Sequence, residues 1–362
     1  MNRALRADDD LVRLHNLGIA AAGLGVVAMG SAAAISLVVY PASSALSPTY
    51  DVEREYSGTA ALILDPRTFT QMRNVPVRGT HRIRVEQVSG DRALVRDTQD
   101  AVAGEAHLPV LSRLWSVDRH TLDGAMTAST DPQGTVVPKG LTFGWPHDAS
   151  CRDYQVWIAD IGASAQARCV RREQHGGIAS EVFTTEVRDH PIADSARATL
   201  PATVPVAVLE RSTAGMPVQQ AQLRMAVDAG IVSDPVRLSY SYKAEITTWV
   251  EPRSGRVVDE ERHEVRTVYA VTAATLAPLT TIQDTTVRDT PQTVAAAVAS
   301  AKAEATRTRP YGPAAQLALA GSGAVLLLVG LVGYVVARRR RQPAPQPWEE
   351  ADATHAGSHS AV

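Results

Sequence analysis

The sequence predicts a mainly β (α+β) protein, in which a large antiparallel β domain lies between a transmembrane helix near each end of the chain. Three observations predict this: an uncharged apolar run at residues 17–40, a second at residues 317–337, and alternating sequence rich in β-formers between them. Each run reaches the length of about 20 residues that a helix needs to cross a bilayer core of about 30 Å. Alternation with a period of two indicates strands in the segment between the two runs.

Charges beside the apolar runs predict that both termini are cytoplasmic. The second run is followed directly by Arg338, Arg339, Arg340 and Arg341, and three arginines precede the first run. Lysine and arginine beside a membrane helix mark its cytoplasmic side. The predicted order is a cytoplasmic leader (1–16), transmembrane helix 1 (17–40), an extracytoplasmic β-rich domain (41–316), transmembrane helix 2 (317–337), and a basic, disordered cytoplasmic tail (338–362).

The first apolar run has two interpretations. It is longer than the apolar core of a typical signal peptide, which favours an uncleaved anchor. The small residues at positions 42–45 resemble a cleavage site, so removal of the run stays open. In either case the main domain is expected outside the cytoplasm of a cell membrane.

Composition and cysteine content limit the functional classes. The net charge of −2 gives no electrostatic reason to expect a nucleic-acid partner. Arginine far outnumbers lysine, and together with many alanines and valines this is typical of a high-GC bacterial genome. Cys151 and Cys169 both fall in the predicted outer domain, where a disulfide is the simplest pairing. The alternative, a pair of metal ligands, lacks further partners at ligand spacing.

The first half of the outer domain is expected to consist of strands. Residues 58–64 are predicted to form a strand that ends in a turn at residues 65–68, where proline occupies the favoured second position. Alternation continues through residues 75–88, and residues 92–95 add a short strand.

A turn pattern occurs three times. An aliphatic residue, an acid, a variable residue, a basic residue and a hydroxyl residue follow one another around Asp65, Asp118 and Glu251. We expect each acid to accept backbone hydrogen bonds in a hairpin turn rather than to act as a catalytic acid. The clearest hairpin is predicted over residues 236–271, where Leu238 and every second residue to Thr248 form a buried face.

Two helices are expected in the outer domain. One is short, around residues 193–199. The other covers residues 291–307, with Thr290 as N-cap and Pro291 at the first helical position, which suits a residue without an N–H.

No residue pattern predicts catalysis, a metal site or a cofactor. His355 and His359 have the spacing of a metal pair but lie in the predicted disordered tail. His147 and His175 are expected to be surface loop residues, and His263 is expected on a solvated charged strand edge. We therefore expect a protein that is not an enzyme.

Several stretches, taken in order, resemble one actinobacterial family, the PorA-family porins, which were formerly a domain of unknown function. The resemblance covers nearly the whole chain and rests on an apolar helix ending at residues 37–41, on residues 58–68, 117–119, 140–146 and 249–255, on Tyr154 and Trp157, and on the arginines after the last helix. The resemblance implies a double-anchored envelope protein with a β-rich outer domain.

The family also suggests a role in envelope lipid traffic. One mycobacterial member is a polar growth factor linked to the trafficking of trehalose monomycolate, and the layout has a more distant architectural similarity to CD36-class receptors, which carry lipid in a tunnel. A porin acting through its strands is the less favoured hypothesis, because such strands need apolar outer faces.

Two functional hypotheses follow. In the first, the outer domain binds a lipid or glycolipid and hands it on during envelope biogenesis, with Phe143, Trp145, Tyr154 and Trp157 as candidate ligand-binding residues. In the second, the protein is a non-catalytic scaffold or accessory subunit of a membrane lipid-export machine. The second is favoured by small residues that permit close helix packing, at Gly18, Gly23, Gly25, Gly30, Gly321, Gly323, Gly330 and Gly333.

Overall fold

The computed structural model describes residues 2–64, 70–129, 131–198, 200–212, 217–231, 233–272 and 275–341. The predicted turn at residues 65–68 and the predicted disordered tail beyond residue 341 lie outside the described residues. The chain divides into two compact units, residues 1–40 with 311–362 and residues 41–310. We call them the helical unit and the β unit.

The helical unit contains the two long helices α1 (Asn2–Ala34) and α7 (Pro313–Arg341), with a π-helical turn at Ile35–Val39 after α1. Two segments are long and apolar enough to cross a membrane, Asn16–Ser44 and Pro291–Arg339. This agrees with the two predicted spans. The charged leader is helical and continuous with α1, which the sequence did not indicate.

Glycines allow α1 and α7 to approach closely. A Cβ built on Gly25 would lie 2.7 Å from the carbonyl oxygen of Gly323, and one on Gly330 would lie 2.6 Å from that of Gly18. A Cβ on Gly23 would meet nothing within 4 Å. Some of the predicted small residues are therefore used within the chain, where they let two backbones touch.

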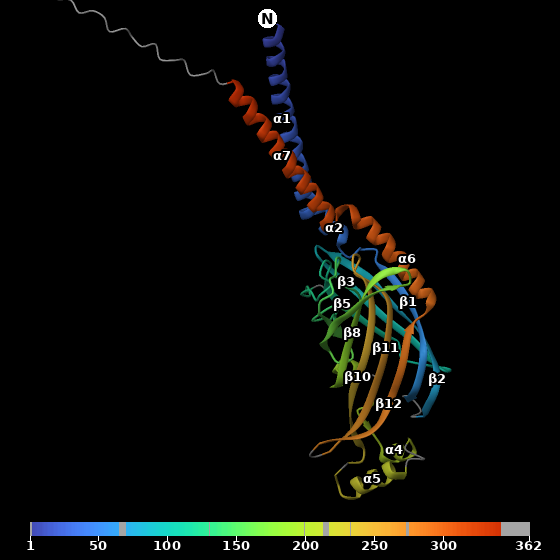
Figure 1. Ribbon diagram of the computed structural model, residues 1–362. Coiled ribbons are helices and arrows are strands. Elements are labelled where there is room, and N and C mark those ends of the chain that lie inside the picture. Colours follow the sequence, from blue (N-terminus) through green and yellow to red (C-terminus); the bar gives the residue numbers. More distant parts are fainter. Residues whose placement is uncertain are drawn as a thin grey trace, which may run out of the picture. The chain divides into compact units, whose positions relative to one another are not determined.

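The β unit is built on one twelve-stranded antiparallel sheet (Figure 1). Its strands are β1 (Asp51–Leu64), β2 (Gln71–Ser89), β3 (Arg92–Ala103), β4 (Ala106–His107), β5 (Leu111–Asp118), β6 (Tyr154–Ile158), β7 (Ala163–His175), β8 (Ile178–Pro191), β9 (Thr203–Val204), β10 (Val236–Glu251), β11 (Arg256–Val271) and β12 (Leu276–Asp289). The main order is β4-β3-β2-β1-β12-β11-β10-β8-β7-β6, with β5 on β3 and β9 on β10. The first and last long strands are therefore neighbours.

The predicted strands are confirmed, and each is longer than expected. Residues 58–64 end β1, residues 75–88 lie in β2, and residues 92–95 begin β3. In β10 the predicted face from Leu238 to Thr248 is buried at every second position. Period-two alternation located these strands because one face of each packs inward.

Two of the acidic turns form as predicted. Asp118 Oδ1 accepts hydrogen bonds from the backbone N–H groups of His120 at 2.9 Å and Thr121 at 2.8 Å. Glu251 Oε2 accepts from the N–H of Ser254 at 2.8 Å, and this turn joins β10 to β11. The Asp118 turn does not lead into a returning strand. The chain makes only an isolated bridge from Gly124 to Val117, so that part of the hairpin prediction is wrong.

Helices of the β unit were predicted in part. Helix α6 (Pro291–Thr308) has Thr290 as its N-cap, whose side chain accepts from the N–H of Thr293. The stretch at 193–199 contains the one-turn helix α3 (Asp194–Arg197). Helices α4 (Val206–Ser212) and α5 (Pro217–Asp228) were missed. The short helices α2 (Tyr40–Ser44) and η2 (Arg309–Tyr311) lie where the chain enters and leaves the β unit.

The sheet curves around an interior that both of its ends help to line. Gln99 on β3 and Asp160, which follows β6, border the same cavity, although their strands lie toward opposite ends of the strand order. The outward face of β1 is polar, since Asp51, Glu53 and Glu55 are exposed. The predicted disulfide between Cys151 and Cys169 is present, with a Cα–Cα distance of 5.2 Å.

Candidate functional site

Three adjoining cavities lie inside the β unit, and we call them together the interior channel. The aromatic cavity, of about 70 Å³, is bordered by the segment around Phe143 and by β6. The charged cavity, of about 110 Å³, shares Arg54 and Glu260 with the aromatic one. The aliphatic cavity, of about 170 Å³, shares Tyr56, Glu264 and Arg266 with the charged one, and its other walls are mainly aliphatic, with Leu200 among them. The composition of the wall therefore changes along the channel.

The wall of the charged cavity is dominated by alternating charges on β11. Residues two apart on a strand face the same side, which brings Glu260, Arg262, Glu264 and Arg266 onto one face. Arg262 Nε donates to Glu260 Oε1 at 2.5 Å, and the hydroxyl of Tyr242 donates to Glu264 Oε1 at 2.7 Å. We call these four residues the charged ladder. The solvated charged face predicted for His263 is the opposite face of β11, where the side chains of His263 and its partner Asp284 are each 39% exposed.

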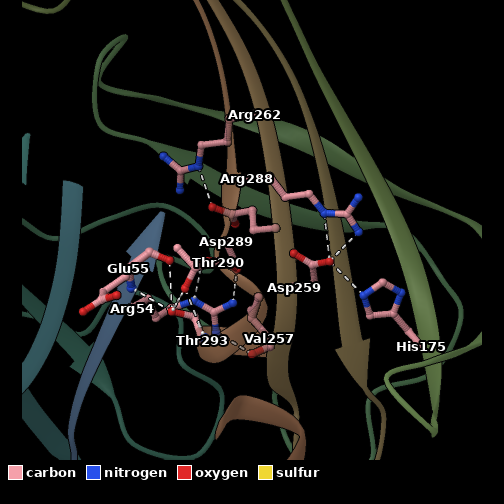
Figure 2. Close-up of polar contacts among 11 residues, drawn as sticks. Arg54, Glu55, His175, Val257, Asp259, Arg262, Arg288, Asp289, Thr290 and Thr293 are labelled. Atoms are coloured by element: carbon pink, nitrogen blue, oxygen red, sulfur yellow. Dashed lines mark hydrogen bonds and ion pairs between the residues drawn. The ribbon is translucent and has the colours of Figure 1, made fainter. Parts of the chain in front are cut away.

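Residues from other segments add polar contacts to the ladder and beside it. Arg266 Nη2 donates to Asp160 Oδ1 at 2.7 Å. Figure 2 shows Arg54 of β1 reaching across to β12, where it pairs with Asp289, and Arg54 Nη1 also donates to the carbonyl of Val257 at 2.6 Å. Buried charges are tolerated when they are paired and hydrogen-bonded in this way.

Electrostatics keep Glu260, Arg262 and Arg266 of the ladder ionised at neutral pH, because burial is outweighed by neighbouring charges, which lower the pKa of Glu260 and raise those of Arg262 and Arg266. Burial alone would raise the pKa of Glu260, but Arg262 and Arg54 outweigh it and hold that pKa below its ordinary value. Burial lowers the pKa of Arg262, but the carboxylates of Glu260 and Glu264 raise it more, so this pKa lies above its ordinary value. The charged cavity is therefore a polar environment with fixed dipoles.

The aromatic cavity holds three of the four predicted ligand-binding residues. Phe143, Trp145 and Trp157 line it, whereas Tyr154 is not among the lining residues. Tyr154 instead packs edge-on against Trp145, with ring centroids 6.5 Å apart, and against Phe183 at 5.8 Å.

Backbone contacts position the aromatic residues. Leu141 N–H donates to Gln155 O at 2.9 Å and Trp157 N–H donates to Leu141 O at 2.7 Å, which fixes the segment before Phe143 beside β6. Trp145 N–H donates to Gly255 O at 2.9 Å, and Gly255, at φ +67°, has no room for a Cβ there. Two stretches that carried the family resemblance, 140–146 and 249–255, therefore contact each other through this hydrogen bond.

Three donors in residues of this cavity are unused. Trp145 Nε1, Trp157 Nε1 and Thr142 Oγ1 are buried and have no hydrogen-bond partner among the residues that the structure describes. An unsatisfied buried donor costs about 1–3 kcal/mol, so three in the lining of one cavity indicate a place for acceptor groups.

Two histidines lie elsewhere than expected. His175 ends β7 and stacks on Trp249 with ring centroids 4.8 Å apart, and its Nε2 lies 2.8 Å from Asp259 Oδ2 (Figure 2). His147 Nε2 lies 3.4 Å from Glu304 Oε1 of α6. His147 does lie in a turn, as predicted, whereas His175 lies on a strand. The prediction of surface residues was wrong for both side chains, which are only 13% and 18% exposed because each ring packs against a carboxylate from another element.

The predicted topology arginines lie on a described helix, whereas the predicted histidine pair does not. Arg338 and Arg339 are exposed at the end of α7, which also contains Arg340 and Arg341. His355 and His359 lie outside the described residues. Within the described ranges no three histidine, cysteine or acidic side chains come together in a metal-binding group.

Sequence reasoning missed the charged ladder. The signal was available, because residues 260–266 alternate glutamate and arginine with a period of two. Exposed strands carry the same alternation, so only the curvature of the sheet decides that this face turns inward.

Residues 17–332 match the profile of the protein family described as Porin PorA. The match covers both membrane-spanning candidates up to residue 332 and the whole β unit. No curated protein matches the chain.

Proposed function

The chain belongs to the PorA family, and from this membership we propose that it is a two-pass membrane protein whose β unit binds a glycolipid, or another amphipathic lipid with a polar head group, in the interior channel. Both termini lie in the cytoplasm and the β unit lies outside. The protein holds and hands on its ligand without a catalytic step.

One observation carries the proposal: the wall of the channel changes from aromatic through charged to aliphatic. Aromatic faces and fixed hydrogen-bonding groups suit sugar hydroxyls, and the unused donors of Thr142, Trp145 and Trp157 suit acceptor oxygens. Aliphatic walls suit a hydrocarbon segment.

The charged ladder decides which part of the ligand each cavity receives. Ionised Glu260 and Arg262 would lose hydrogen-bonding solvent against a hydrocarbon chain. We therefore assign the polar head group to the charged and aromatic cavities. The hydrocarbon segment next to the head group is assigned to the aliphatic cavity.

The polar outer face supports a water-facing β unit. A strand-lined pore requires an apolar band on the outside of the strands. Asp51, Glu53 and Glu55 are exposed on β1, so we propose that α1 and α7 cross the membrane and the strands do not.

The direct test is lipid analysis of the full-length protein purified in a non-ionic detergent. We expect a stoichiometric glycolipid by mass spectrometry of the organic extract. Ala101, which borders the charged and aliphatic cavities, is changed to phenylalanine to fill the channel, and Ala179→Phe, at an exposed strand position, is the matched control. We expect loss of the lipid in Ala101→Phe only.

A second variant tests the polar contacts without filling space. Trp157→Phe keeps an aromatic ring but removes the unused N–H donor. We expect it to retain less lipid than the wild type while its thermal unfolding temperature stays the same or rises. A folded wild-type protein that yields no lipid would contradict the proposal and would favour the scaffold hypothesis, which crosslinking to membrane partners would then test.

A further inference from the structure

A fourth cavity of the β unit, which shares Phe143 and Trp145 with the aromatic cavity, is basic. It has a volume of about 150 Å³ and lies beside the residues by which the chain enters and leaves the unit. Its charged and titratable lining consists of Arg119, His120, His147, Arg256, Arg307 and the single carboxylate of Glu304. We call it the basic pocket.

Positive charge exceeds negative charge in the basic pocket. Glu304 accepts from Arg256 Nε, and its Oε1 lies 3.5 Å from Arg307 Nη2. Burial raises the pKa of Glu304, but the hydrogen bond from His147 and the charge of Arg256 lower it to about 2, so this carboxylate is ionised at neutral pH. Three arginines against one carboxylate still leave an excess of two positive charges among these four side chains.

Arg119 is held in place without a neutralising partner. Its Nε donates to the carbonyl of Leu46 at 2.9 Å and its Nη1 to the carbonyl of Gly90 at 3.0 Å. No carboxylate pairs with its guanidinium among the residues that the structure describes. The guanidinium is therefore pre-organised, and it keeps its full charge for an incoming anion.

A further contact fixes a second arginine of the pocket. Arg256 Cζ lies 5.4 Å from the centroid of the Tyr50 ring, within the distance of about 6 Å that is typical of a cation–π contact. The orientation of the Arg256 guanidinium is therefore also fixed. A half-buried cluster of fixed cations is costly unless anions approach it.

We propose that the basic pocket binds a phosphate-type anion, either the phosphate of an anionic phospholipid head group or free phosphate. Arginine forks match phosphate oxygens in a bidentate manner. Ser44 is the last residue of the first membrane-spanning candidate, Ser47 follows it shortly after, and Arg307 precedes α7 by a few residues. This sequence position favours the lipid source. The proposal does not depend on a ligand in the interior channel.

The test uses the full-length protein in a non-ionic detergent, with calorimetric titration of three probes. These are inorganic phosphate, short-chain phosphatidylglycerol and short-chain phosphatidylcholine. We expect saturable binding of phosphatidylglycerol and none of phosphatidylcholine. Binding of both phosphate and phosphatidylglycerol assigns the anion as the recognised group, and binding of phosphate alone assigns a free anion as the ligand.

Variants locate the binding. Arg119→Gln and Arg307→Gln are each expected to weaken binding about tenfold, because each removes a charge-assisted hydrogen-bond donor. Arg307 has a side chain that is 66% exposed, so its replacement is not expected to disturb folding. Arg188→Gln, at a side chain that is 81% exposed on β8, is the matched control and should bind as the wild type does. The proposal is overturned if neither anion binds, or if Arg307→Gln binds as tightly as the control.

Discussion

Replacing Glu304 by glutamine tests the electrostatics of the basic pocket. Glu304 lies on α6, where its carboxylate contacts Arg256, His147 and Arg307. Its pKa in the folded protein is about 2, against an ordinary value of 4.5. A folded-state pKa below the unfolded-state pKa means that the ionised carboxylate stabilises the fold.

The size of the effect follows from that difference in pKa. At about 1.4 kcal/mol for each pH unit, the fall from 4.5 to about 2 corresponds to roughly 3 kcal/mol. Part of the carboxylate remains open to solvent, which screens the interaction, so we reduce the expected contribution to about 2 kcal/mol. For a unit of this size, that corresponds to a fall of roughly 4–8 °C in unfolding temperature.

The sign of the pH dependence is fixed by the same argument. The stabilisation is fully present above the unfolded-state pKa of 4.5 and is lost as the pH falls toward about 2. We therefore expect Glu304→Gln to unfold at a lower temperature than the wild type at pH 7, and the two curves to converge between pH 4.5 and about pH 2.

The assay is thermal unfolding of the full-length protein in a non-ionic detergent, followed by near-ultraviolet circular dichroism from pH 7 down to pH 2.5. Glu105→Gln, at an exposed turn position, is the control and should change the unfolding temperature very little. A difference between wild type and Glu304→Gln that stays constant across this range would refute the electrostatic explanation, as would no difference at pH 7.

Three further changes test other parts of the fold. Gly25→Val is expected to disrupt the pairing of α1 and α7, because its Cβ would lie 2.7 Å from backbone, whereas Gly23→Val meets nothing within 4 Å and should pair normally in a cysteine-crosslinking assay. Cys151→Ser opens a loop with a sequence separation of 18 and should lower the free energy of unfolding by roughly 3 kcal/mol in denaturant titrations; an unchanged midpoint would contradict this. Phe183→Ala should cost about 3–5 kcal/mol because Phe183 is 1% exposed, and Val170→Ala, at 49% exposure, should cost far less in the same titration.

Local patterns in the sequence predicted the elements that depend on local chemistry. The hairpin of β10 and β11 was predicted because one face alternates apolar residues and Glu251 closes the turn with its own side chain. Helix α6 was predicted because Thr290 can cap it and Pro291 starts it. Helices α4 and α5 were missed because neither begins with an acidic first turn and α5 has weak amphipathic character.

The candidate site was predictable only in part, because it depends on contacts between distant segments. Three of the four aromatic candidates line one cavity, but Tyr154 turns toward Phe183 instead. The roles of Arg54 and Asp160 depend on partners on β12 and β11, far away in the sequence. Sequence alternation shows that a strand has two faces, but it cannot show that a curved sheet encloses the charged one.

The pairing of β1 with β12 couples the two halves of the chain thermodynamically. Tyr56 is opposite Asp289, so the start of the first strand and the end of the last lie side by side. Without the sheet, pairing of α1 with α7 would close a loop of about 270 residues. Once β1 and β12 are paired, only about 30 residues of connecting chain remain to be closed. This shortening is about three halvings of the loop length, and it lowers the free-energy cost of loop closure by roughly 2 kcal/mol. Because linkage is reciprocal, pairing of the helices returns the same free energy to the sheet, so a ligand that tightens one element strengthens the other.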